Sequence, residues 1–325
     1  MLEMGHRTDT FAELIARTEA DLRALMSIPE RYSILFLHGG ASLQFAMVPL
    51  NLLGGRERAS YVNTGMWSAK ALKEAGRMCQ VHVAADAAAS NYSAIPPASQ
   101  WQVPADSAYL HYTVNETIGG VEFHWVPHIE EIPLVADMTS MILSRPIDVR
   151  HHTLIYAGAQ KNLGIAGLAV VIVDREKLQP VPEGTPSLLD MQTHIQTGSL
   201  YNTPPIFAWY VTSKMLEWVK GEGGVDAFAE RNRRKAALLY DAIDASNLYG
   251  NPVQHDCRSW MSVPFTLADH SLESLFLKEA QQAGLLGLAG HRSVGGLRAC
   301  IYNSMPEDGV KQLVEFMREF ERVRA

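Results

Sequence analysis

The sequence has few cysteines and no paired cysteine motif. Its 325 residues include only three, Cys79, Cys257 and Cys300, which lie far apart and form no Cys-x-x-Cys pair. A disulfide framework or a metal site is therefore not expected. Low cysteine content is typical of a reducing compartment, and we expect a cytoplasmic protein.

Long apolar runs and excess positive charge are also missing. No uninterrupted apolar stretch approaches the ~20 residues of a membrane-spanning helix, and the first residues, MLEMGHRTDT, lack the apolar core of a signal peptide. A formal net charge of −7 argues against a nucleic-acid partner or an anionic membrane surface. It leaves room for a local basic pocket that binds a small anion.

Apolar runs alternate with helical stretches through the first two thirds of the chain. Alternating strands and helices favour parallel strands joined by right-handed crossovers. The fully apolar run at 167–173 is typical of a strand buried on both faces. Strands are predicted at residues 33–37, 59–62, 108–113, 133–136, 153–157 and 167–173. Helices are predicted from about residue 42, at 66–75, and at 206–220.

A glycine-rich break at 221–224 separates this region from a different pattern. The remaining strands and helices have longer connections, which indicates a smaller α+β unit. Because the length favours two domains, we predict a large domain at 1–221 and a small C-terminal domain at 222–325. The later helices are predicted at about 226–246, 271–283 and 306–323, and the later strands at 260–265 and 296–302.

The polar residues that follow the predicted strands are the first candidates for a site. In open α/β sheets, ligands bind at the carboxyl ends of the strands. As a set, these residues match the requirements of pyridoxal phosphate. They are Gly39-Gly40-Ala41-Ser42, Trp67, Thr117, Asp137 and Lys161.

Lys161 and Asp137 carry the chemistry of this hypothesis. A lysine at a strand end, bounded by small residues, can form a Schiff base with an aldehyde cofactor, although an exposed surface lysine is the common alternative. A buried carboxylate such as Asp137 needs a partner, and a protonated pyridine nitrogen is one. The alternative for Asp137 is a helix cap before Thr139 and Ser140.

The glycine pair and Trp67 offer weaker evidence. Gly39 and Gly40 let backbone N–H groups approach a phosphate at a helix N-terminus, but the motif is neither a P-loop nor a dinucleotide fingerprint. Trp67 is suited to stacking on a flat ring, and its alternative is a half-buried core tryptophan.

Several segments together resemble the phosphoserine aminotransferases, from about residue 6 to the C-terminus. The resemblance implies an α/β, aspartate-aminotransferase-like type I fold, with a large, mostly parallel seven-stranded sheet, a smaller C-terminal α+β domain and a homodimeric assembly. The segments are HGGASLQFAMVPLNLL, YVNTGMW, LHYTVNETIGGVEF, ADMTSMILSRPIDV, YAGAQKNLGIAGL, YNTPPIFAWY and GHRSVGGLRACIYN.

The resemblance also implies roles in binding pyridoxal 5′-phosphate. Lys161 is the Schiff-base lysine, Asp137 pairs with the ring nitrogen, and Trp67 stacks on the ring. Thr117 lies near the ring hydroxyl. The phosphate is bound by Ala41, Ser42 and Gln160, and by Asn202 and Thr203 of the partner subunit.

Substrates that carry a carboxylate and a phosphate need several cationic partners, preferably arginines. The resemblance implies that Arg298 binds the substrate α-carboxylate. It assigns the substrate phosphate to His6, Arg7, His291 and Arg292. The alternative is that these pairs are surface salt-bridge groups.

Two departures from the family pattern stand out. Ser42 occupies a position where some members carry an arginine, which shifts phosphate binding toward His291 and Arg292. Family members also carry a few dozen residues before the position of His6, including a Ser-Gly-Pro-like segment near the active site, which have no counterpart here.

The implied reaction is a reversible transfer of the amino group from L-glutamate to 3-phosphohydroxypyruvate in serine biosynthesis. It gives O-phospho-L-serine and 2-oxoglutarate, with Lys161 moving the proton at Cα. The resemblance leaves open a second role, in pyridoxine biosynthesis. The alternatives are another type I aminotransferase, such as an alanine–glyoxylate type, or a truncated dimer that binds the cofactor but is inactive.

Overall fold

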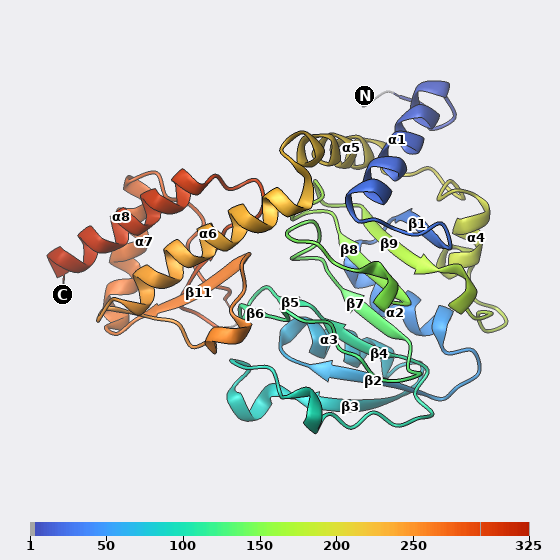
Figure 1. The fold of residues 1–325 in the computed structure, drawn as a ribbon, viewed down its shortest axis with the longest axis horizontal. Coiled ribbons are helices and arrows are strands. Elements are labelled where there is room, and N and C mark those ends of the chain that lie inside the picture. Colours follow the sequence, from blue (N-terminus) through green and yellow to red (C-terminus); the bar gives the residue numbers. More distant parts are fainter. Residues whose placement is uncertain (1–3, 293, 325) are drawn as a thin grey trace.

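The computed structural model describes residues 4–292 and 294–324, and a seven-stranded sheet forms its centre (Figure 1). The strands are ordered β1-β9-β8-β7-β4-β2-β3. A two-stranded hairpin, β5 (Asn115–Glu116) and β6 (Val121–Glu122), follows β4. The sheet strands are β1 (Tyr32–Leu37), β2 (Arg58–Asn63), β3 (Gln80–Asp86), β4 (Leu110–Thr113), β7 (Leu134–Asp137), β8 (Leu154–Gly158) and β9 (Ala169–Asp174).

Strand β9 differs from the predicted parallel pairing. It runs antiparallel to both of its neighbours, β8 and β1. Only residues 159–168 connect β8 to β9, and a parallel crossover needs a dozen or more residues. The other adjacent pairs are parallel. The predicted strand at 167–173 begins only at Ala169, and every residue of β9 is buried, whereas Gly167 is exposed.

Helices cover both faces of the sheet, and alternate residues of the strands face each layer. On β1, Ile34 and Phe36 pack with α1 (Asp9–Leu25) and α5 (Ile206–Gly221). Leu35 and Leu37 point to the opposite face. The helices on that face are α2 (Gly40–Leu52), α3 (Met66–Ala75) and α4 (Met191–Gln196).

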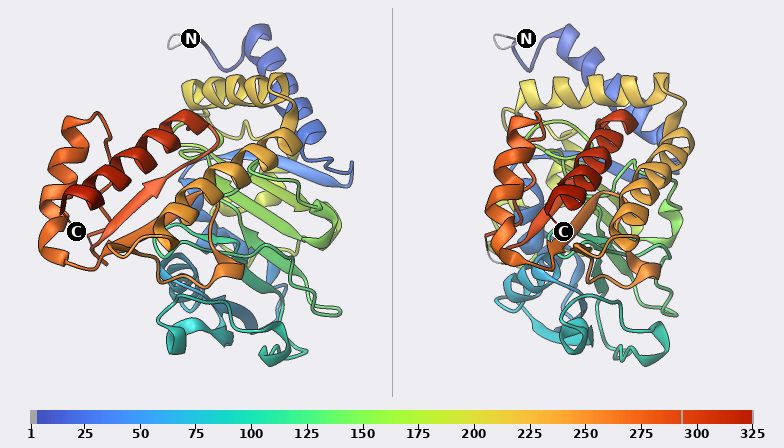
Figure 2. Two further views of the ribbon diagram at one scale, coloured as in Figure 1. Left: turned by 60° about the vertical axis from the view of Figure 1, so that its left-hand side comes forward. Right: turned by 90° about the vertical axis from the view of Figure 1, so that its left-hand side faces the viewer.

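The C-terminal elements lie to one side of this sheet, as Figures 1 and 2 show in orange and red. They form an antiparallel sheet, β10-β11-β12, and an apolar core drawn only from residues 236–320. The predicted boundary at 221 falls between α5 and α6, and the division into domains stays a prediction. The elements are α6 (Gly224–Asp244), β10 (Tyr249–Gly250), β11 (Ser262–Leu267), α7 (Glu273–Gln282), β12 (Leu297–Cys300) and α8 (Glu307–Arg324).

None of the helices among the described residues has the length and apolar character needed to cross a membrane.

Candidate active site

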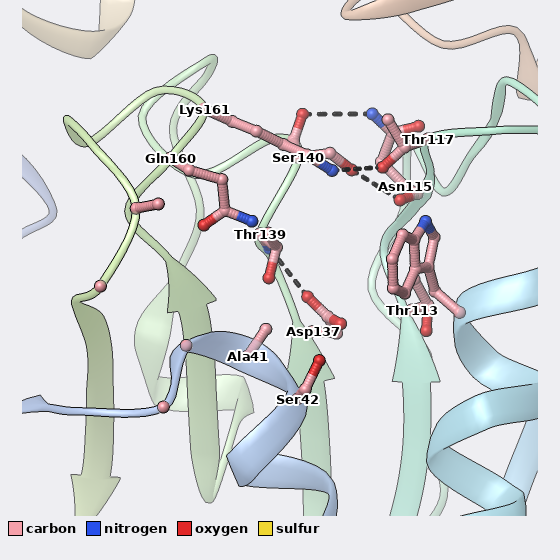
Figure 3. Close-up of a pocket in the computed structure, with 15 residues that line it drawn as sticks. Ala41, Ser42, Thr113, Asn115, Thr117, Asp137, Thr139, Ser140, Gln160 and Lys161 are labelled. Atoms are coloured by element: carbon pink, nitrogen blue, oxygen red, sulfur yellow. Dashed lines mark hydrogen bonds between the residues drawn. The ribbon is translucent and has the colours of Figure 1, made fainter. Parts of the chain in front are cut away.

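A cavity of about 340 Å³ lies at the carboxyl ends of β4, β7 and β8, beside the start of α2. In Figure 3, Lys161 and Thr117 lie above Asp137, and Ala41 and Ser42 lie below it. Separate strand-to-helix turns thus place predicted residues around one space. The cavity is lined by seven of the residues predicted to bind the cofactor: Ala41, Ser42, Trp67, Thr117, Asp137, Gln160 and Lys161.

The Lys161 amine points into this cavity from the loop after β8. Its Nζ donates a hydrogen bond to Thr117 Oγ1 at 2.5 Å. Burial lowers the pKa of Lys161 to about 8, while the nearby Asp137 carboxylate opposes this shift. A far larger share of the amine is therefore neutral near pH 7 than in an exposed lysine, which suits a nucleophile or a base.

Asp137 ends strand β7, and its side chain is almost fully buried. Its Oδ1 accepts a hydrogen bond from the Thr139 backbone N–H at 2.9 Å. Burial raises the pKa of Asp137, and hydrogen bonds from Thr139 oppose this shift. Among the described residues, no lysine, arginine or histidine forms a salt bridge with Asp137. A cationic group within the cavity would stabilise the ionised carboxylate.

A buried tyrosine–histidine pair lies behind Asp137. Tyr156 is the cross-strand neighbour of Asp137 on β8, and hydrogen bonding by its hydroxyl lowers the pKa of Asp137. The same hydroxyl lies 2.8 Å from His111 Nε2. Burial lowers the pKa of His111 to about 3, so this histidine is neutral at physiological pH.

Trp67 is held by a carboxylate that the sequence analysis did not select. The Glu116 side chain accepts hydrogen bonds from the backbone N–H of Trp67 at 3.0 Å and of Ser68 at 2.8 Å. The Ser68 hydroxyl donates a third bond at 2.7 Å. Glu116 therefore satisfies the first N–H groups of α3 and fixes Trp67 at the cavity wall. A Cβ on Gly65 would lie 2.7 Å from Glu116 Cδ, so the glycine is required there.

The glycine pair gives α2 an open N-terminus beside the cavity. Gly39 and Gly40 have φ values of +80° and +60°, which glycine adopts at little cost. The first N–H groups of a helix have no intrahelical acceptor, and no side chain caps this end of α2. This turn can therefore bind an anionic group such as a phosphate.

Three buried polar atoms of cavity residues lack hydrogen-bond partners among residues 4–292 and 294–324. They are Trp67 Nε1, Thr113 Oγ1 and Asn115 Oδ1. Buried polar groups normally find partners, so these atoms indicate a polar ligand. Together with the lysine, the aspartate and the open helix end, they fit pyridoxal phosphate. Thr113, the last residue of β4, and Asn115, the first residue of β5, were not among the predicted site residues.

Arg298 approaches the same region from the C-terminal unit. Its Nη1 lies 3.4 Å from the Thr117 carbonyl oxygen, and its buried Nε has no partner among the described residues. Its positive charge also lowers the pKa of Lys161, after the larger effect of burial. Arg298 is thus close enough to Lys161 for one small molecule to contact both.

The remaining predicted residues lie elsewhere. A second depression, here called the N-terminal hollow, is lined by His6, Arg7, Leu200, Tyr201, Asn202 and Thr203. His38 Nε2 is hydrogen-bonded to the Thr203 carbonyl oxygen at 3.0 Å. His291 and Arg292 precede β12 and line neither the cavity nor the hollow.

Comparisons with known proteins give the same assignment of fold and chemistry. The family model for class-V aminotransferases matches residues 2–313. A phosphoserine aminotransferase of Nitrosomonas europaea is 53% identical over 334 residues, which cover 100% of this chain and 90% of that protein. The chain belongs to the phosphoserine aminotransferase family of class-V aminotransferases.

Solved structures of this family have the same fold. The phosphoserine aminotransferase from Bacillus circulans subsp. alkalophilus superimposes with a TM-score of 0.97 at 46% identity, covering 100% of this chain and 90% of the other. A pyridoxal-phosphate-bound member from Trichomonas vaginalis gives 0.93 at 36% identity, covering 98% and 90%. The predicted family, type I fold and class of pyridoxal-phosphate-dependent aminotransferase are confirmed.

Proposed function

We propose that the chain transfers the amino group reversibly between L-glutamate and 3-phosphohydroxypyruvate, forming O-phospho-L-serine and 2-oxoglutarate. The observation that carries this proposal is the cavity at the strand ends, which is lined by both Lys161 and the buried Asp137 carboxylate. Relatives named phosphoserine aminotransferase, 50% identical or more, support the choice of substrates.

The cofactor is proposed to bind with its ring between Trp67 and the opposite cavity wall. Pyridoxal phosphate supplies an electron sink for the bond that breaks at the substrate Cα. Asp137 accepts a hydrogen bond from the protonated ring nitrogen. The backbone N–H groups of Ala41 and Ser42, at the start of α2, would donate hydrogen bonds to the cofactor phosphate. The side-chain amide of Gln160 would donate another. Thr117 lies beside the ring hydroxyl.

Lys161 is proposed to hold the cofactor and then to move the substrate proton. As a neutral amine it would accept the proton from the substrate Cα, and as an ammonium ion it would act as the acid that returns a proton. A pKa of about 8 lets both forms exist near neutral pH. The hydrogen bond to Thr117 holds the amine within the cavity.

Substrate selectivity is proposed to come from cationic side chains that bind the carboxylate and the phosphate at the two ends of the substrate. Arg298 binds the α-carboxylate, since it already lies beside Thr117 and Lys161. His6, Arg7, His291 and Arg292 bind the phosphate. We also propose a cytoplasmic homodimer in which Asn202 and Thr203 of one subunit reach the cofactor phosphate of the other.

A comparison of substrates tests this function. The purified protein with pyridoxal phosphate is assayed with phosphoserine and 2-oxoglutarate, and in parallel with serine or with alanine and glyoxylate. We expect kcat/KM for phosphoserine to exceed that for serine by at least about 10³-fold, because a charged phosphate contributes several kcal/mol. Equal turnover of alanine and glyoxylate would favour a different aminotransferase. Binding of the cofactor without any glutamate half-reaction would indicate an inactive protein.

A further inference from the structure

Three buried asparagine amides converge on the turn that follows β7. The carbonyl oxygens of three consecutive residues each accept a hydrogen bond from one of them. Asn162 Nδ2 donates to Ile142 O at 3.0 Å. Asn303 Nδ2 donates to Leu143 O at 2.8 Å, and Asn232 Nδ2 donates to Ser144 O at 3.0 Å. The turn is thereby fixed at three successive points.

The three asparagines come from segments that lie far apart in the sequence. Asn162 directly follows Lys161, Asn232 lies within α6, and Asn303 follows β12, the strand that carries Arg298. All three are at most 2% exposed. Figures 1 and 2 show α6 as the long helix leading from the sheet toward the C-terminal unit.

The amides also bind one another. The Asn303 backbone N–H donates to Asn162 Oδ1 at 3.1 Å, and Asn232 Nδ2 donates to Asn303 Oδ1 at 2.8 Å. A continuous path of hydrogen bonds therefore runs from the Lys161 segment to the segment after β12. Because a buried amide that loses its partner is costly, this path resists sliding of one segment past the other.

A buried lysine fixes the far end of the same path. Lys235, one helical turn after Asn232 on α6, donates hydrogen bonds to the carbonyl oxygens of Ile301 at 3.0 Å, Tyr302 at 2.8 Å and Met305 at 3.0 Å. Its side chain is fully buried. The segment around Asn303 is thus held against α6 from one side and against Asn162 from the other.

We propose that Asn162, Asn232 and Asn303 are positioning residues that set the separation between Lys161 and Arg298. This inference rests on the proposed function, in which Arg298 binds the substrate carboxylate and Lys161 removes the adjacent proton. Both groups act on neighbouring atoms of one small molecule, so a displacement of about 1 Å is expected to cost up to about a hundredfold in rate. The asparagines touch neither substrate nor cofactor.

Binding of a non-reacting dicarboxylate to the holoenzyme tests the proposal. Glutarate has the two carboxylates of glutamate and no amino group, and its dissociation constant is measured calorimetrically at a temperature well below unfolding. In Asn303→Ala we expect this constant to rise about tenfold, while the affinity for pyridoxal phosphate and the cofactor absorbance change less than about twofold. If Asn303→Ala fails to fold, Asn303→Asp serves as the second variant. It keeps the acceptor for Asn232 and removes the donor to Leu143 O.

Val310→Ala is the matched control, because Val310 is a 1% exposed residue of the C-terminal core outside this path. It lowers the melting temperature and should leave glutarate binding unchanged. Equal glutarate affinity in wild type and Asn303→Ala would overturn the positioning role, and so would equal weakening in Val310→Ala. Arg298→Lys distinguishes failure of the positioning role from failure of the proposed function. If Arg298→Lys leaves glutarate affinity unchanged, the proposed role of Arg298 in binding the carboxylate is wrong.

Discussion

The main cavity and the N-terminal hollow both gather candidate binding residues, but they are built differently. In the main cavity, Thr113, Thr117 and Asp137 are at most 6% exposed and lie at or just beyond strand ends. In the hollow, Tyr201 is 47% exposed, and Arg7 and Thr203 are exposed as well.

The two regions therefore differ in how far their own chain buries the candidate binding residues. The cavity has a nucleophile, a carboxylate and an open helix end, and its polar lining residues Thr113, Thr117 and Asp137 are buried. The hollow has polar and cationic groups on an open surface. Such groups gain most of their binding strength when water is excluded from them. A partner subunit seated on the hollow would exclude that water, and the predictions below probe the two regions.

The largest effect is expected from the cavity lysine. Lys161→Ala should lower kcat by about 10⁴-fold or more, because both the covalent attachment and the proton transfer are lost. The visible absorbance of the bound cofactor should shift in the same variant. Arg7→Ala is the control in the hollow and should keep that absorbance. Full turnover by Lys161→Ala would contradict the assigned chemistry.

The next effect concerns the buried carboxylate. Asp137→Asn should lower kcat by about 10²–10³-fold, because a neutral amide no longer favours the protonated ring nitrogen. Steady-state rates and the absorbance of the cofactor measure this change. Asp148→Asn is the control, since Asp148 is paired with exposed Arg150 on the surface. A similar loss of kcat in both variants would contradict the proposal that Asp137 acts on the ring nitrogen.

Mixing two inactive variants tests whether the hollow belongs to a site on the partner. Unfolded and refolded together in equal amounts, Lys161→Ala and Arg7→Ala should recover about a quarter of wild-type activity, since half of the dimers carry one intact site of two. Refolding each variant alone gives the baseline. If the mixture stays at that baseline, the two residues act in the same subunit.

The pH dependence of cofactor uptake reports on the Lys161 amine. With a pKa of about 8, the rate at which the cofactor-free protein takes up pyridoxal phosphate should rise about tenfold per pH unit below pH 8 and level off above it. A rise that continues to pH 10 would indicate an ordinary exposed amine.

The lowered pKa of Lys161 also makes the free energy of unfolding of the cofactor-free protein depend on pH. Between pH 8 and the ordinary lysine pKa of about 10.5, the unfolded chain binds more protons than the folded one. The free energy of unfolding of the cofactor-free protein therefore gains a contribution as pH rises through this window. That contribution should be absent from Lys161→Met, and chemical denaturation at several pH values measures the difference.

The smallest effect is expected at Glu116. Glu116→Gln removes the charge but keeps one acceptor for α3, and it should lower the free energy of unfolding by about 1–3 kcal/mol. Cofactor affinity should fall a few-fold because Trp67 is less firmly held. Ser68→Ala removes only one of the three contacts and should have a weaker effect on both. Equal effects of the two variants would contradict the view that the carboxylate holds Trp67.

Much of the fold was predictable from local pattern. The helix at 66–75 has the predicted bounds, and the strands near 33, 134 and 154 begin within a residue or two of prediction. Helix α1 was missed, although Thr8 caps it, because its charged residues hide the apolar positions. Strand β3 was also missed, since its residues are only partly buried and its apolar pattern is weak.

Part of the candidate site was equally predictable. The apolar runs that precede Lys161, Asp137 and Trp67 made the positions of these residues at the strand ends predictable from the sequence. Glu116 and Asn162 were not, because their roles come from hydrogen bonds to residues about 50 and 140 positions away. Such contacts leave no periodic trace in the sequence.

The sequence by itself determined which residues stand at the ends of strands, since apolar runs and the glycines that punctuate them are local properties of the chain. It also determined the family, through motifs spread along its whole length. Only the tertiary structure decided that Glu116 holds Trp67 and that three asparagines link the segment of Lys161 to the segment after β12. Those arrangements depend on which buried polar groups find partners when distant segments pack together, and local sequence does not encode that choice.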